Sequence, residues 1–196
     1  MGGSLIVLII LAVFVLYGVG AYNGLISLKN QTLNAFKQID VQLKRRHDLI
    51  PNLVNAVKGA MDFERQTLEA VIQARNQAVS AGANAGPGAM KQVAAAENQL
   101  SAALSRFNVV VEQYPQLKAT ANVGQLQEEL TSTENRISFA RQAYNDTATQ
   151  YNTKQQQFPT NLFAGIAKAT PAEPWEIEDQ AERAVPQVDL SSKPKA

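Results

Sequence analysis

The chain has no cysteine and only one histidine among its 196 residues. Without cysteine there is no disulfide, no thiolate nucleophile, no zinc finger and no site for a lipoprotein anchor. A single histidine supplies neither the paired Glu-x-x-His motifs of a di-iron bundle nor a catalytic triad, since no serine elbow accompanies His47. The Gly-rich stretch 81–89 lacks the Gly-Lys-Ser/Thr ending of a phosphate loop. We therefore expect a protein that is not an enzyme and holds no metal or cofactor.

The chain also lacks an excess of charge of either sign. The formal net charge is +1, with 18 basic and 17 acidic residues. A balance of this kind gives no strong field over the surface, so we expect no nucleic-acid partner. Strictly alternating apolar and polar residues, which predict strands, do not occur over a useful length, and this favours an all-α chain.

The first 28 residues carry no charged side chain. Within them, Leu5 to Ala21 is an unbroken apolar run that spans ~26 Å as a helix, close to the ~30 Å hydrocarbon core of a bilayer. No lysine or arginine precedes Leu5, so the basic region of a cleaved signal peptide is missing. We predict a short amino terminus at 1–4 and a retained transmembrane helix at 5–22.

Basic residues follow the apolar run and do not precede it. They are Lys29, Lys37 and the run Lys44-Arg45-Arg46. By the positive-inside rule, the amino terminus lies outside and the body of the protein lies in the cytoplasm. The lipid bilayer is therefore the first predicted partner.

Residues 23–169 have apolar positions at alternating steps of three and four, which predicts helices that pack as an antiparallel bundle. Pro51 marks either a corner between two helices or a kink in one helix that continues to Val79; the unbroken apolar stripe favours the kink. The expected helices are 23–48, 51–80, 90–114 and 124–157.

The stretch 170–196 has four prolines and a cluster of acidic residues, which predicts a mostly disordered tail. Trp175 and Ile177 are the exceptions. We expect them to dock on the bundle; the alternative is a short linear motif that binds another protein.

Several charged residues fall on apolar stripes. Buried charges must be paired, so these residues predict an internal polar network that sets the register of the helices. If Ile39 and Arg46 face inward instead, Asp40 and His47 lie at the flank of the stripe. The expected network comprises Asp40, His47, Glu64, Arg75 and Glu97.

Gly20 and Gly24 have the GxxxG spacing at the membrane exit. Small residues at this spacing let two membrane helices approach closely, so these glycines are the predicted packing site of the membrane helix.

The segment IDVQLKRRHDLIPNLV, residues 39–54, resembles the LemA family. The resemblance extends upstream to the anchor and downstream to ENRISFARQAYN at 134–145 and to Phe158-Pro159, and it covers residues 5–163. It implies an amino-terminal span in the bacterial inner membrane, a cytoplasmic helical bundle and no settled activity. Relatives act in organising bacterial membranes, including those of magnetosomes.

Two functions follow as hypotheses. The first is a non-enzymatic scaffold that forms a homo-oligomer and organises a region of the membrane. The alternative is a membrane-tethered adaptor or sensor that docks a cytoplasmic protein partner.

Overall fold

In the computed structural model, which describes residues 2–58, 65–83, 85–86, 88–118 and 120–175, every regular element is a helix. The expectation of an all-α fold is thus confirmed for these ranges. The helices are α1 (Gly2–Lys58), α2 (Arg65–Gly82), α3 (Met90–Glu112), α4 (Pro115–Lys118), α5 (Ala121–Gln156) and α6 (Asn161–Ala164).

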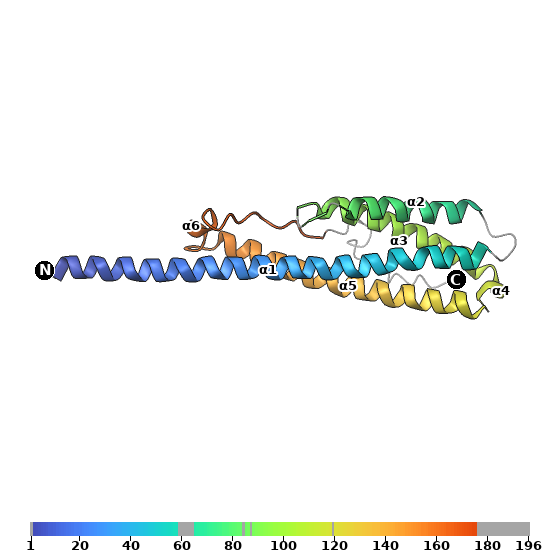
Figure 1. Ribbon diagram of the computed structural model, residues 1–196, viewed down its shortest axis with the longest axis horizontal. Helices are drawn as coiled ribbons and strands as arrows, with labels where there is room; N and C mark the ends of the chain where they lie inside the picture. The colour runs from blue at the N-terminus through green and yellow to red at the C-terminus, as the bar shows by residue number, and fades with distance from the viewer. Residues whose placement is uncertain (1, 59–64, 84, 87, 119, 176–196) are drawn as a thin grey trace, which may run out of the picture.

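The helix α1 has 57 residues and carries the chain from the apolar run into the bundle without a break. Figure 1 shows its amino-terminal part projecting alone beyond the other helices. Among the described helices, α1 alone is long and apolar enough to cross a membrane, and that stretch is almost wholly exposed. The core helix of a soluble protein would be buried, so α1 fits a single transmembrane helix followed by a helical bundle.

Pro51 lies inside α1, so it does not form a corner between two helices. The expected break between 48 and 51 is absent, and the helix runs on to Lys58. The same helix does not reach Val79, however, because α2 begins at Arg65 as a separate helix that packs on α1 and α3. The other helix bounds differ from the expected ones by a few residues.

The bundle is built from two helix pairs. The first is α1 with α5, which is the most extensive contact in the molecule, and the second is α2 with α3. Figure 1 shows α5 lying along α1 over most of the bundle, with α2 and α3 on the opposite side. Both pairs follow from apolar stripes on the helices. A short connection joins α2 to α3, whereas α1 and α5 meet although three helices separate them in the chain.

The buried apolar side chains form two clusters, one on each side of a polar layer. The proximal core lies nearer the membrane span and is built from α1, α3, α5 and the segment 167–175. The distal core is built from α1, α2, α3 and the region around α4 and the start of α5. Representative members are Leu25, Ile39, Met90, Ile137 and Tyr144 in the proximal core, and Ile50, Val57, Val71, Leu100 and Phe107 in the distal core.

The segment 167–175 takes the place that α2 holds in the distal half. Trp175 is 3% exposed, and the expectation that it docks on the bundle is confirmed. Residues 170–175 of the predicted disordered tail are therefore docked, which corrects the prediction for these residues, and the rest of that stretch, with Ile177, lies outside the described residues. The docked segment contributes Ala167, Ala172 and Trp175 to the proximal core.

Two asparagines of α5 hold this segment by its backbone. The Asn145 side chain accepts from the Trp175 N–H at 2.7 Å and donates to the Trp175 carbonyl at 3.1 Å. The Asn152 side chain likewise accepts from the Ala172 N–H and donates to the Ala172 carbonyl, each at 2.8 Å. The asparagines are seven residues apart and so share one helix face. They satisfy backbone groups of an extended segment that has no neighbouring strand.

Replacing both asparagines, Asn145→Ala with Asn152→Ala, removes these four hydrogen bonds. At about 1 kcal/mol for each bond, we expect the docked segment to lose several kcal/mol and detach. Trp175 is the single tryptophan of the chain, so its fluorescence emission reports detachment as a shift to longer wavelength. Asn135→Ala, at an exposed asparagine of α5, is the matched control. An unchanged spectrum in the double variant would contradict the proposed role of the asparagines.

Candidate functional site

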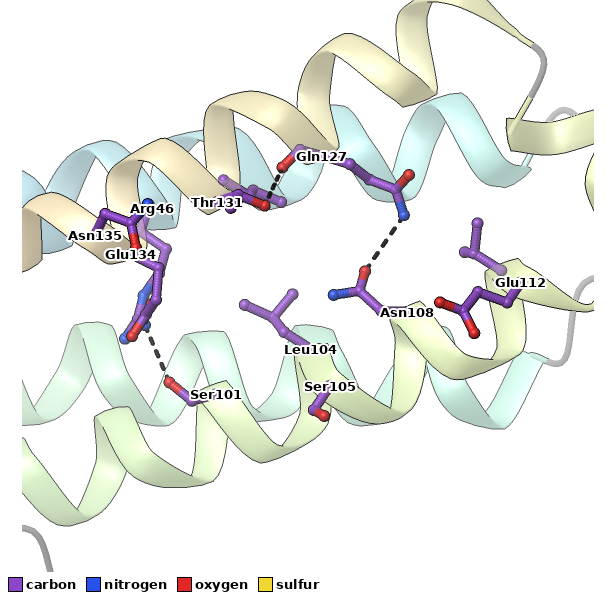
Figure 2. A pocket seen from close by; sticks show the side chains of 12 residues that line it. Arg46, Ser101, Leu104, Ser105, Asn108, Glu112, Gln127, Thr131, Glu134 and Asn135 are labelled. Carbon is purple, nitrogen blue, oxygen red and sulfur yellow. Dashed lines mark hydrogen bonds and ion pairs between the residues drawn. The ribbon is translucent and has the colours of Figure 1, made fainter. Parts of the chain in front are cut away.

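Arg46 of α1 lies between the two cores with its side chain 1% exposed. Its guanidinium donates hydrogen bonds to the carboxylates of Glu97 on α3 and Glu134 on α5, and to Ser101 Oγ at 3.1 Å. Figure 2 shows Arg46, Ser101 and Glu134 converging from three helices. A single cation therefore ties together α1, α3 and α5.

Glu97 is also fully buried, and its carboxylate accepts a second hydrogen bond from α1, donated by His47. His47 Nε2 lies 2.9 Å from Glu97 Oε1. An ionised carboxylate only accepts, so Nε2 carries the hydrogen in this contact. Burial by itself raises the pKa of Glu97, but the hydrogen bond from His47 and the charge of Arg46 outweigh burial and hold that pKa below its ordinary value.

These pairings set the register of the helices. Taking an arginine and a glutamate out of water costs several kcal/mol for each ion unless each finds a partner. If α3 or α5 slipped by one turn along α1, Arg46 would lose a carboxylate and a buried charge would be left unpaired. The ion-pair layer, defined here as Arg46, His47, Glu97 and Glu134, thus selects one alignment of the bundle.

Arg75 of α2 lies beside this layer and bonds to the backbone of α1. Pro51 has no N–H, so the carbonyl four residues earlier in α1, that of His47, has no helical donor. Arg75 Nε of α2 donates to this carbonyl at 3.2 Å. The side chain of α2 thus supplies the hydrogen bond that the proline removes, and it fixes α2 against α1 at that level.

The residues of the predicted network are distributed as follows. The structure brings His47 and Glu97 into contact and places Arg75 on the His47 backbone. Asp40 is exposed, because Ile39 takes the inward position, and the expectation that Asp40 lies in the core is corrected. Glu64 lies outside the described residues.

The predicted network did not include Arg46 of α1, and no apolar stripe indicated Glu134 of α5. Arg46 belongs to the alternative register, in which buried positions of α1 follow steps of four and three: Ile39, Leu43, Arg46, Ile50, Leu53 and Val57. This register was recognisable from Ile39 and Ile50. Glu134 is next to the buried Thr133 and reaches Arg46 from the edge of α5, so no apolar period pointed to it.

An open groove of about 520 Å³ lies between α3 and α5, beside the ion-pair layer. Figure 2 shows its lining side chains facing one another across the gap. Gln127 of α5 donates to Asn108 of α3 at 3.3 Å and bridges the groove. The walls are mostly amides, hydroxyls and carboxylates, among them Ser105, Asn108, Glu112, Gln127 and Thr131.

The chemistry of the site is the pairing of buried charged side chains between helices. Within the ranges that the structure describes, no group of three His, Cys, Asp or Glu side chains is placed to bind a metal ion. The His47 ring contacts Glu97, and the Ser101 hydroxyl accepts from Arg46. Ser101 and His47 therefore do not form a pair of nucleophile and base. Gly20 and Gly24 have open space around them in α1, which leaves their predicted packing role a prediction.

A transmembrane helix that continues as one arm of a bundle, with an ion-pair layer across its core, defines a membrane-anchored helical bundle. The family model of the LemA family matches residues 35–190. The chain belongs to the LemA family.

Curated relatives agree with this assignment. The chain is 28% identical over 155 residues to Protein LemA of Metamycoplasma hominis. The matched region covers 79% of this chain and 68% of that protein. The chain is 26% identical over 166 residues to Magnetosome protein MamQ 2 of Paramagnetospirillum magneticum, and 24% identical over the same length to Magnetosome protein MamQ of Magnetospirillum gryphiswaldense. In both magnetosome relatives the match covers 74% of this chain and 61% of the relative.

The link between Pro51 and Arg75 is tested by a double-mutant cycle. Arg75→Met leaves the His47 carbonyl without its donor, and we expect the free energy of unfolding to fall by about 1–3 kcal/mol. In a Pro51→Ala background, the restored Ala N–H serves that carbonyl, so the same change costs less. Urea unfolding followed by circular dichroism measures both costs. Arg65→Met, at the exposed arginine that starts α2, is the control. Equal costs in the two backgrounds would refute the link.

The ion-pair layer predicts acid sensitivity. The pKa of Glu97 is lower in the folded than in the unfolded chain, so the unfolded state takes up the proton first. The free energy of unfolding should fall as the pH drops from about 4.5 toward the folded value, while the contribution is fully present at neutral pH. Glu97→Gln should remove this part of the slope and cost about 3–5 kcal/mol at neutral pH, since Arg46 loses a buried partner.

The matched control is Glu69→Gln, at an exposed glutamate of α2 that pairs with Arg65 on the same helix. It should keep the acid slope and the stability of the unmodified protein. If Glu97→Gln and the unmodified protein unfold with the same dependence on pH between 3 and 7, the layer does not control acid stability.

Proposed function

We propose that the protein is a non-enzymatic scaffold that self-associates and organises a region of the bacterial inner membrane. The observation that carries this proposal is the continuity of α1: one helix of 57 residues is both the membrane span and a core helix of the bundle. A bundle attached in this way keeps a set direction relative to its anchor, whereas a flexible linker would let it reorient. Rigid presentation of this kind suits an assembly of many copies.

The membrane exit offers a contact for a second copy. A Cβ atom added at Gly20 or Gly24 would meet no other atom within 4 Å, so this face of α1 is open. Small residues allow close approach of helices in lipid, where packing replaces the hydrophobic effect as the driving force. Two relatives are magnetosome proteins, which supports a role at a bacterial membrane.

The proposed orientation puts the amino terminus outside and the bundle in the cytoplasm. Lys29 and Lys37 lie on the bundle side of the span, and no charged side chain lies on the other side. The positive-inside rule supports this arrangement.

An adaptor for a cytoplasmic protein is the second candidate. The groove between α3 and α5 favours it, because its lining residues lie in the half of each of these helices that is remote from the membrane span. In this case the functional particle would hold one copy of the chain, and the groove would be its docking surface.

The oligomeric state of the full chain in lipid nanodiscs tests the scaffold. Single-particle mass measurement should give multiples of the 21.3 kDa protomer. Gly20→Val with Gly24→Val should shift the particles toward one copy, because the added side chains keep the helices apart. Gly3→Val, at another open glycine of α1, is the control and should leave the mass unchanged. A single copy at every concentration would refute self-association and favour the adaptor.

A further inference from the structure

Apolar side chains gather on the short turn that follows α5. Phe158 is 81% exposed, Leu162 is 55% exposed and Ile166 is 71% exposed. We call residues 158–166, which include α6, the proximal turn. Beyond the membrane span, the other exposed large apolar residues of the described chain lie along the bundle helices, where Val41 and Phe139 share one open groove between α1 and α5. A cluster of this kind on one short turn marks an interaction site.

The proximal turn is packed against the span itself. The ring of Phe163 lies 5.5 Å from that of Phe14 and 6.2 Å from that of Tyr17, measured between centroids. Gly18 makes room for this ring, since a Cβ added there would lie 2.6 Å from Phe163 Cε1. Tyr17 Oη and Thr160 Oγ1 are also within hydrogen-bond distance, at 3.3 Å.

These contacts set the depth of the turn. Phe14 to Gly18 precede the end of the span at Tyr22 by four to eight residues, which is ~6–12 Å along a helix. One leaflet contributes about 15 Å of hydrocarbon. If 5–22 lies in the bilayer, the ring of Phe163 therefore lies in the acyl-chain region of the leaflet nearest the bundle, and the proximal turn lies in that leaflet with it. Figure 1 shows α6 beside the part of α1 that leaves the bundle.

The backbone of the turn suits this position. Lipid offers no hydrogen-bond partners, so a turn at this depth must satisfy most of its own polar groups. The N–H groups of Asn161, Leu162 and Phe163 bond within the turn to the carbonyls of Gln157, Pro159 and Thr160. Those of Ala167 and Ala169 bond to Phe163 and Ala164.

The charges around the turn also suit a lipid surface. No aspartate or glutamate occurs in residues 1–39 or 147–172, which form this end of the molecule. The charged side chains in these ranges are Lys29, Lys37, Lys154 and Lys168. Lysines attract anionic headgroups, and the exposed Lys168 follows the turn directly.

We propose that the proximal turn is a second membrane contact, in which Phe158, Leu162 and Ile166 insert into the leaflet nearest the bundle. Continuity with the span and the lack of acidic residues identify lipid as the occupant. Attachment at two points fixes the tilt and height of the bundle above the bilayer. The turn displaces lipid in one leaflet only, on one side of α1.

Site-directed spin labelling tests this contact in the full chain, which has no native cysteine to replace. Leu162→Cys and, separately, Ile166→Cys receive a nitroxide in nanodiscs that contain anionic lipid. Oxygen concentrates in lipid and a nickel chelate stays in water, so their collision rates with the label report its surroundings. Leu11→Cys in the span and Phe139→Cys, at an exposed phenylalanine of α5, are the lipid and water controls.

We expect the labels in the turn to show an oxygen-to-nickel ratio several-fold above that of the Phe139 label and close to that of the Leu11 label. A ratio equal to that of the Phe139 label at both positions would overturn the proposal. Low collision rates with both reagents would also overturn it, since a second copy of the chain would then cover the turn. A water-like result at Leu11 would overturn the span together with the turn.

Discussion

The structure depends on one backbone constraint, which is that α1 must be a helix along its whole length. In lipid the helix is required because no other partner exists for N–H and carbonyl groups. In the bundle it is required because α5 and α2 pack on its side chains and α3 meets them in the two cores and at Arg46. The same 57 residues therefore serve two environments, and the bundle inherits the direction of the span. The ion-pair layer, the contact of Arg75 with the His47 carbonyl and the packing of the proximal turn all involve this helix.

Charges placed inside the bundle decide how the helices align. Apolar stripes allow helices to slide by a turn, since one leucine replaces another with little loss of packing. Arg46 does not allow this, because its buried guanidinium needs Glu97 and Glu134 at one height. The layer also separates the proximal core from the distal core, so the two halves are built with different fourth elements. In the distal half that element is α2, and in the proximal half it is the segment held by Asn145 and Asn152.

Several features were predictable from the residues. The uncharged run of Leu5 to Ala21 predicts a span, and α1 fits one. The steps of three and four predict helices with the observed inward faces on α3 and α5. Glu97 was recognisable as a charge in a core position. Asp40 was misplaced because two possible stripes share Leu43 and Ile50: one continues through Ile39 and Arg46, and the other through Asp40 and His47. The contact of Glu134 with Arg46 depends on the reach of a long side chain from the edge of α5.

Sequence alone determined that this protein has one membrane span, an all-helical body and polar groups inside it, because hydrophobic period and charge content are local properties of the chain. Tertiary structure decided which charges meet, that Arg75 serves the carbonyl left open by Pro51, that Trp175 belongs to the core, and that the turn at 158–166 lies against Phe14 and Gly18. These contacts join residues from 28 to 149 positions apart, and no local pattern encodes such a distance.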